Sequence, residues 1–298
     1  MKIIGEYQNG NYAVTLWSDG TKVRENDLDF FAPEKPESMD LKITNCCDMG
    51  CKFCHEDSKP DGKHGDILSL PFLDSLLPYT EIAIGGGNPL EHPDLIPFLE
   101  LLNSKNLIPS MTVNQMHFMN NIGVLHNLVD RKLIYGLGIS LIHPSGEFVS
   151  AVSRFPNAVI HVINGVVPFV HLQTLAKKNF KILILGYKEF RRGDAMYASE
   201  HEDIEGRKSI LYKNLPAIIK DGWFDVVSFD NLAIKQLNPK RLMSDAQWNK
   251  FYMGDDGSFT MYVDAVNWEF AKSSISTERW TITDDIKEMF NTVKEYSL

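Results

Sequence analysis

The sequence contains no cysteine outside one short stretch. Its four cysteines, Cys46, Cys47, Cys51 and Cys54, lie close together in residues 46–54. A framework of structural disulfides would distribute cysteines along the chain, so the class of small cross-linked proteins is excluded. Cysteines gathered in this way are typical of metal ligands or of redox-active thiols.

The sequence also lacks the segments that direct a chain into a membrane or out of the cell. It has no run of about 18 apolar residues, the minimum for a membrane-spanning helix. The N-terminal stretch MKIIGEYQNGNY contains no apolar core of about 7–15 residues, which a signal peptide requires. We therefore expect a cytoplasmic protein with no membrane partner.

Clustered positive charge is absent as well. The chain has 30 lysines and arginines against 39 aspartates and glutamates, a formal net charge of −9, and no basic block stands out. Proteins that bind nucleic acid through its phosphates depend on such blocks. We therefore do not expect nucleic acid as a partner.

What the sequence does contain is a regular alternation of strand-like and helix-like segments from residue 40 onward. Short apolar, β-branched runs are each followed by a polar loop and an amphipathic stretch, which predicts parallel strands with helices packed outside them. The predicted strands are residues 40–44, 81–85, 109–113, 134–141, 158–163, 181–186 and 225–229. In such folds the reactive groups follow the carboxyl ends of the strands.

The segments at the two ends of the chain have a different pattern. Asn9-Gly10 and Asp19-Gly20 are hairpin signals and predict an N-terminal β-meander over residues 1–36. Residues 252–274 alternate around Asp256-Gly257 and predict a second hairpin, and residues 284–296 predict a final helix.

The predicted fold is thus α/β, a partial (β/α)6-type barrel of parallel strands with an N-terminal β-meander and a C-terminal β-hairpin plus helix. We expect three regions: the meander at 1–36, the partial barrel at 37–235, and an extension at 236–298 that packs on the barrel.

The cysteine loop has the spacing C-x3-C-x2-C over Cys47, Cys51 and Cys54. Thiolates at this spacing converge on one metal centre, and soft sulfur ligands favour zinc or an iron–sulfur cluster. Three thiolates leave one iron of a [4Fe–4S] cluster open, as a catalytic centre requires. The alternatives are a zinc site that adds Cys46 or His55, and a free-thiol redox loop. Cys46 lies outside the spacing, and we expect it to be a small buried apolar residue.

The stretches CDMGCKFC after the first barrel strand and GGGNPLEHPDL after the second resemble the radical S-adenosylmethionine (SAM) superfamily. The resemblance covers roughly residues 38–190. It implies that Cys47, Cys51 and Cys54 hold a [4Fe–4S] cluster, and that SAM chelates the fourth iron. It further implies that reductive cleavage of SAM produces a 5′-deoxyadenosyl radical, which abstracts a hydrogen atom from a substrate.

The resemblance also implies a set of SAM-binding residues. Phe53 matches a position near the adenine, and the glycine loop approaches the methionine end of SAM. The family's usual Glu after two glycines is replaced by Asn88, whose amide accepts a hydrogen bond without charge, and Glu91 is the candidate for the missing charge. The implied SAM-binding residues are Phe53, Gly85, Gly86, Gly87, Asn88, Pro89, Asn114 and Ser140.

Because no cysteine follows Cys54, clusters or thiyl chemistry supplied by later cysteines of this chain are excluded. We expect direct hydrogen abstraction, with an external electron donor of flavodoxin or ferredoxin type. A peptide or protein residue is the expected substrate. A small metabolite or nucleoside, and a non-catalytic iron–sulfur or SAM-binding sensor, are the alternatives.

The remaining polar residues near the predicted strand ends have two readings each. One is contact with substrate. The other is an ordinary structural role: a turn or a core position for the histidines, a solvated loop for the arginines. The catalytic residue among them is not assigned. These candidates are His117, His143, His161, Arg191, Arg192, Asp230, Asn231 and Asp256.

Overall fold

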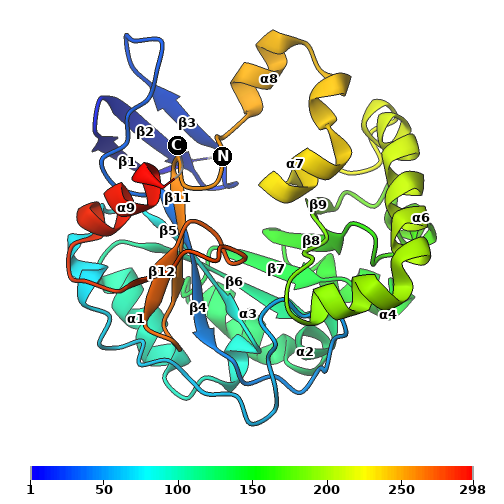
Figure 1. Cartoon of the computed structure of the whole chain (residues 1–298), viewed down its shortest axis with the longest axis horizontal. Helices are drawn as coiled ribbons and strands as arrows, with labels where there is room; N and C mark the ends of the chain where they lie inside the picture. The colour runs from blue at the N-terminus through cyan, green and yellow to red at the C-terminus, as the bar shows by residue number, and fades with distance from the viewer. Residues whose placement is uncertain (1, 297–298) are drawn as a thin grey trace.

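The structure is a computed structural model that describes residues 2–296, and its central element is one ten-stranded sheet. The strand order is β10-β9-β8-β7-β6-β5-β4-β11-β12-β13 (Figure 1). Every pairing from β10 to β11 is parallel, and the last two are antiparallel. The strands are β4 (Ser38–Thr44), β5 (Glu81–Gly86), β6 (Ile108–Asn114), β7 (Gly136–Ser140), β8 (Ala158–Ile163), β9 (Lys181–Leu185), β10 (Val226–Phe229), β11 (Thr260–Asp264), β12 (Glu269–Ala271) and β13 (Trp280–Thr281).

This sheet confirms the predicted α/β fold class. The seven predicted barrel strands correspond to β4 through β10, in the predicted order. Within the described residues, β10 and β13 are the free edges of the sheet, so the barrel is partial.

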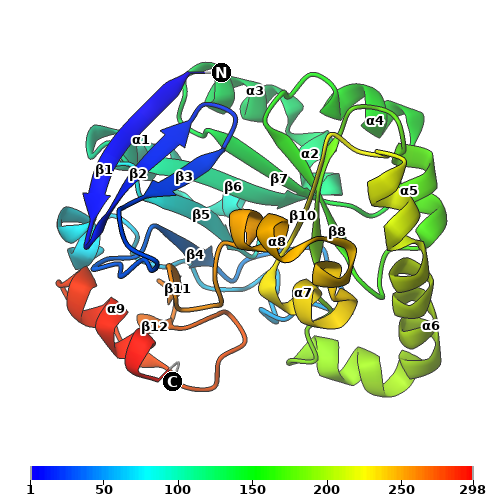
Figure 2. The ribbon, with the colours of Figure 1, turned by 90° about the horizontal axis from the view of Figure 1, so that it is seen from above.

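Helices cover the outer, convex side of the sheet (Figures 1 and 2). They are α1 (Leu95–Ser104), α2 (Gln115–Asn120), α3 (Ile122–Asp130), α4 (Gly146–Val152), α5 (Phe169–Leu175) and α6 (Arg192–Lys220), while α7 (Asn231–Leu237), α8 (Asp245–Phe251) and α9 (Ile286–Glu295) follow later in the chain. Three short 3-10 helices occupy Pro71–Ser75, Pro89–Glu91 and Pro239–Leu242.

The two faces of the sheet differ in chemistry because successive side chains of a strand point to opposite sides. On β6, Met111 and Val113 are buried in the core against the helices, whereas Ser110, Thr112 and Asn114 face the concave side. β7 likewise presents Gly136, Gly138 and Ser140 on the concave side, whereas β8 and β9 add the branched residues Val159, Ile163, Leu183 and Leu185. A closed barrel fills its interior with large branched side chains. Here the concave side is left open as a cavity.

Side chains bridge the gap between the two ends of the curved sheet. Asn231, at the start of α7, donates a hydrogen bond of 2.7 Å to Asp256, which precedes β11. Lys188, after β9, donates one of 2.8 Å to Ser274, after β12. The sheet therefore curls far enough for its β9–β10 side to touch its β11–β12 side, although no strands pair there among the described residues.

The N-terminal meander forms a separate antiparallel sheet of β1 (Ile3–Asn9), β2 (Tyr12–Trp17) and β3 (Lys22–Glu25), as predicted. Gly10 in the first turn has φ of 62°, which glycine adopts without strain. The buried Glu37, just before β4, binds the meander: it accepts hydrogen bonds from Tyr12 Oη at 2.6 Å and Arg24 Nε at 2.7 Å. A second cavity of about 370 Å³ lies between the meander and the amino ends of β6 to β10.

The predicted position of the C-terminal hairpin turn is wrong. β11 and β12 pair antiparallel, and the turn between them is at residues 265–268, not at Asp256-Gly257. Asp264 selects this turn because its Oδ1 accepts hydrogen bonds from the backbone of Val266 and Asn267, both at 3.0 Å. β11 also pairs in parallel with β4, so the hairpin extends the main sheet.

Helix α6 continues through Pro216. Proline cannot donate to the carbonyl four residues earlier, which belongs to Tyr212. Arg241 Nη2 donates to that carbonyl at 2.7 Å instead. The non-helical position of α6 is Glu200, with φ of −125°. The predicted C-terminal helix is present as α9, and among residues 2–296 no helix has the length and apolarity needed to cross a membrane.

Candidate functional site

A cavity of about 630 Å³ occupies the concave side of the sheet. Its walls come from the concave side of β4 to β10, from β11, and from the loops at the carboxyl ends of the parallel strands, where the strand topology predicts a site. Nine of the eleven residues predicted to bind the cluster or SAM line it: Cys47, Cys51, Phe53, Cys54, Gly85, Gly86, Gly87, Asn114 and Ser140. The structure does not bring Asn88 and Pro89 to the cavity wall.

The three cavity thiols belong to Cys47, Cys51 and Cys54, on the loop after β4. All three side chains are half-buried, and none forms a disulfide. Burial raises the pKa of Cys47 and Cys51, and the nearby charges of the other cavity thiols raise it further. The three thiols therefore line one cavity in which burial and their mutual charges disfavour the thiolate form, although the Arg192 charge favours it at Cys51. A metal centre bound there would favour the thiolates.

Cys46 points away from this group. Its Sγ donates to the carbonyl of Pro60 at 3.3 Å, and the side chain is partly exposed outside the cavity wall. The expectation of a buried apolar residue is wrong. The Cys46 backbone connects the cysteine loop to the glycine loop, because its carbonyl accepts a hydrogen bond of 2.7 Å from the Asn88 amide.

The three glycines after β5 have different roles. Gly86 has φ of 109°, and a Cβ on it would lie 2.5 Å from the Thr44 carbonyl oxygen. A Cβ on Gly87 would lie 2.2 Å from the Cys46 carbonyl oxygen. These two glycines therefore let the loop pack against the start of the cysteine loop. A Cβ on Gly85 would meet nothing within 4 Å, so Gly85 is the one that leaves cavity space open.

Asn88 is buried, and its side chain forms hydrogen bonds with neighbouring residues of the same loop. Its Oδ1 accepts from the Leu90 amide at 3.3 Å and caps the 3-10 helix Pro89–Glu91. Its Nδ2 donates to Glu91 Oε1, also at 3.3 Å. The Asn88 amide therefore orients Glu91 at the end of the glycine loop.

Asn114 and Ser140 lie side by side in the register of β6 and β7. Asn114 Oδ1 caps α2 by accepting from the Met116 amide at 2.9 Å. The Ser140 hydroxyl has no hydrogen-bond partner among the described side chains and faces the cavity. Phe53 lines the same cavity and packs against a small core cluster that includes Tyr187 and Met196.

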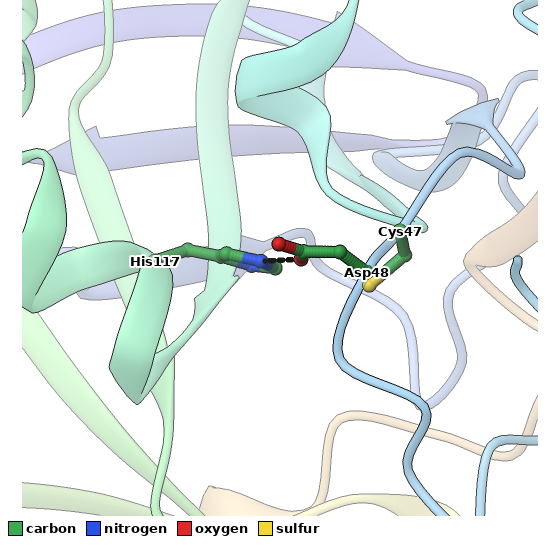
Figure 3. Close-up of side chains that lie close together, drawn as sticks. All are labelled: Cys47, Asp48 and His117. Atoms are coloured by element: carbon green, nitrogen blue, oxygen red, sulfur yellow. Dashed lines mark hydrogen bonds and ion pairs between the residues drawn. The ribbon is translucent and has the colours of Figure 1, made fainter. Parts of the chain in front are cut away.

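His117, from α2, lies beside the cysteine loop. Its Nε2 is 2.7 Å from Asp48 Oδ1, and the two side chains point toward each other in Figure 3. This hydrogen bond lowers the pKa of Asp48. The sulfur, oxygen and nitrogen of Cys47, Asp48 and His117 all lie within 4.8 Å of one another, and these are donor types that zinc accepts.

His55, the residue considered as a fourth zinc ligand, is engaged elsewhere. Its Nε2 lies 3.2 Å from Lys188 Nζ and 3.4 Å from Glu56 Oε1. Burial lowers the pKa of His55, and the Lys188 charge lowers it further.

A buried ion-pair network beneath the cysteine loop was not predicted. Lys42 Nζ lies 3.0 Å from both Glu56 Oε2 and Asp264 Oδ2, and the Lys42 side chain is 1% exposed. Tyr262 Oη donates to Glu56 at 3.1 Å. Although burial raises the pKa of Glu56, the hydrogen bond and charge of His55 and the charge of Lys42 bring it well below its usual range. The network joins the end of the cysteine loop to β4 and β11.

Arg191 and Arg192 bind the protein's own loop. Arg191 Nη1 donates to the Glu56 carbonyl at 2.9 Å, and Arg192 Nε lies 3.0 Å from Asp57 Oδ1. The start of α6 therefore fixes the segment that follows Cys54. Neither of the two readings given for these arginines describes this role.

Of the other candidate residues, some line the cavity and some form only structural contacts. His143 is exposed beside His171, with 3.3 Å between the Nδ1 and Nε2 atoms. Asp230 faces the cavity but also caps α7, accepting from the Ala233 amide at 2.7 Å. Asp256 and Asn231 form the bridge described above. His161 faces the cavity from β8.

Asp40 was missed, although its strand offered a signal. It is one of two charged residues in β4, the other being Lys42, and it alternates with the buried Met39 and Leu41, which places it on the concave side. It lines the cavity, and burial together with the charges of Asp256 and Asp230 raises its pKa.

The sequence matches no protein-family model and no curated protein. The fold is similar to that of two crystal structures of SuiB from Streptococcus suis. One is bound to the precursor peptide SuiA, with a TM-score of 0.55 and 11% identity. The other is bound to S-adenosylmethionine, with a TM-score of 0.53 and 12% identity. The matches cover 87% of this chain but only 65% and 66% of the SuiB chains.

Proposed function

We propose that the chain is a radical SAM enzyme in which Cys47, Cys51 and Cys54 hold a [4Fe–4S] cluster. The observation that carries the proposal is that Cys47, Cys51 and Cys54, and not Cys46, line one cavity, on the loop that follows a parallel strand. When bound and reduced, the cluster and SAM supply an electron and a 5′-deoxyadenosyl radical that abstracts hydrogen from a substrate.

The residues around the thiols fit this pair of cofactors. Gly85 leaves backbone exposed beside the cysteine loop, and the Ser140 hydroxyl is free to bond a polar group of SAM. Phe53 offers an apolar ring at the same wall. Glu91, the candidate for the missing charge, is hydrogen-bonded to Asn88 but does not line the cavity, so the carboxylate expected at this position is not supplied there.

The proposed substrate is a peptide. SuiB, which has a similar fold, binds a precursor peptide, and the cavity here offers many hydrogen-bonding groups on its concave floor. A small metabolite or a nucleoside is the alternative. The electron would come from an external donor of flavodoxin or ferredoxin type.

Anaerobic reconstitution with iron and sulfide tests the cluster. Cys47→Ala, Cys51→Ala and Cys54→Ala should each lose the visible absorbance of the cluster. Cys46→Ala is the matched control and should keep it, because its thiol points away from the cavity. Loss of the cluster in the Cys46 variant would contradict the ligand assignment.

Metal analysis separates this proposal from a zinc site. If the chain instead holds stoichiometric zinc that depends on Asp48 and His117, the Cys47–Asp48–His117 group is the metal site and the cluster assignment fails.

Formation of 5′-deoxyadenosine from SAM tests the activity. Reduced, cluster-loaded protein should produce it, and pooled short peptides should stimulate production more than pooled nucleosides. Stimulation by nucleosides alone would favour the alternative substrate. A stable cluster that binds SAM without cleaving it under any condition would indicate a sensor.

A further inference from the structure

The cavity floor contains a notch in which two polar side chains face each other across a glycine. Gly138 lies on β7, between Thr112 on β6 and His161 on β8. A Cβ on Gly138 would lie 2.6 Å from Thr112 Oγ1, 2.6 Å from His161 Nε2 and 2.5 Å from His161 Cε1. The absence of a side chain at residue 138 is therefore what leaves room for both groups.

The two polar groups are close to each other and unpaired. Since each lies 2.6 Å from the same point, Thr112 Oγ1 and His161 Nε2 are at most twice that distance apart. Both residues line the cavity and are half-buried. No described side chain or backbone group forms a hydrogen bond with the Thr112 hydroxyl or with the His161 ring. A polar group in such a place is available to a ligand.

The chemistry of the pair selects a neutral ligand group. Burial lowers the pKa of His161 to about 4, so the ring is neutral at pH 7 and carries one N–H and one acceptor nitrogen. A threonine hydroxyl also donates and accepts. No described charged side chain forms an ion pair with His161, so nothing at the notch balances an ammonium or a carboxylate. An amide, with one donor and one acceptor, matches the pair.

We propose that Thr112, Gly138 and His161 form a subsite that binds a neutral amide group of the peptide substrate. This inference rests on the proposed function, because it assigns the notch to substrate and not to SAM. Gly138 lets the His161 ring and the Thr112 hydroxyl lie close together over the strand, and these two side chains hydrogen-bond the N–H and C=O of an amide group in the cavity.

Three matched probes test the subsite on the full chain, prepared anaerobically. N-acetylalanine N-methylamide is neutral, N-acetylalanine carries a carboxylate, and alanine N-methylamide carries an ammonium. Their affinities are measured by ligand-observed NMR titration, and the His161 ring resonances report where they bind. The neutral probe should bind at least fivefold more tightly than either charged probe and should shift the His161 signals.

Variants locate the binding. Gly138→Ala should weaken the neutral probe at least fivefold, because the new methyl group displaces the His161 ring and the Thr112 hydroxyl from their positions. The ring end of His161 and the Thr112 hydroxyl can move aside, so this variant should fold. Gly136→Ala is the matched control: it adds a methyl on the same face of the same strand, 3.2 Å from Ser110 Cβ, and should change affinity less than twofold. Thr112→Val removes only the hydroxyl and should weaken the neutral probe as well.

Equal binding of all three probes, or an affinity unchanged by Gly138→Ala, would overturn the subsite. Competition with SAM is the second arm: if saturating SAM on cluster-loaded protein displaces the neutral probe, the notch belongs to SAM and the inference fails. The proposed function is tested separately, by SAM cleavage. If the chain does not cleave SAM, the proposed function fails, but the affinities measured for the three probes remain valid.

Discussion

The buried Lys42 provides the sharpest test of how the cysteine loop is held. Its ammonium lies between Glu56 and Asp264, at 3.0 Å from each, and all three side chains are nearly inaccessible to water. Lys42→Met keeps the length of the side chain but removes the charge. The variant leaves two buried carboxylates without their shared cation, the situation in which breaking a buried pair is most costly.

The magnitude follows from what each carboxylate retains. Breaking a buried ion pair by removing one partner typically costs about 3–5 kcal/mol. Glu56 keeps the hydrogen bond from Tyr262, and Asp264 keeps those from the Val266 and Asn267 amides. We therefore expect Lys42→Met to lower the free energy of unfolding by about 3 kcal/mol, the lower end of this range. For 298 residues, an unfolding entropy of about 2.1 cal/mol/K per residue converts this to a fall in Tm of roughly 5 °C.

Thermal unfolding of the metal-free chain, followed by circular dichroism, is the assay. Lys63→Met is the matched control, because Lys63 is exposed on the same segment of chain and its ammonium forms no ion pair among the described residues. Its Tm should change by less than about 1 °C, as surface substitutions usually do. If Lys42→Met loses no more Tm than Lys63→Met, the network does not stabilise the loop. A double variant with Glu56→Gln should lose less than the two single variants added together, because they share one interaction.

Three further outcomes follow from the site. The raised pKa values of Cys47 and Cys51 predict that iodoacetamide alkylates these thiols, in the metal-free chain, only at a higher pH than it needs for the cysteine of a short peptide. If the two thiols and the peptide cysteine are alkylated at equal rates at neutral pH, this prediction is wrong. The folded-state pKa of His161, about 4 against 6.5 for the unfolded group, means that the unfolded chain binds more protons between these values. His161 therefore contributes a loss of stability as pH falls from 6.5 to 4, and His161→Asn should flatten the dependence of urea midpoints on pH in that window. Gly87→Ala should cost about 1–3 kcal/mol in urea unfolding, since its Cβ overlaps a backbone carbonyl, whereas Gly85→Ala should leave stability unchanged; equal losses would contradict the packing described.

Much of the fold could be predicted because its signals are local. The alternation of apolar and polar residues identified β4 through β10, and the Asn-Gly and Asp-Gly turns identified the meander. The C-terminal hairpin could not be placed correctly. Its register depends on the pairing of β11 with β4, far away in the sequence, and on the hydrogen bonds of Asp264. That pairing also joins the predicted regions 37–235 and 236–298, whose boundary stays a prediction.

The position of the cysteine loop at the cavity could be predicted because that loop follows a parallel strand, whereas its metal chemistry stays a prediction. Contacts between distant segments could not be predicted. Nothing in the sequence near Arg191 indicates that it binds the Glu56 carbonyl, and nothing near Asp48 indicates His117. Lys42 and Asp40 gave a weak signal, because a charged residue in an apolar strand must either find a partner or face a cavity. Their partners could be found only in three dimensions.

The bridge between Asn231 and Asp256 has a consequence for how the wall of the cavity is held together. Separating paired strands breaks a whole ladder of backbone hydrogen bonds together. Here the two sides of the curved sheet meet through single side-chain hydrogen bonds, such as those of Asn231 and Lys188. Each contributes only about 0.5–1.5 kcal/mol. Breaking these hydrogen bonds would therefore separate the two sides of the cavity wall while every strand of the sheet stays paired.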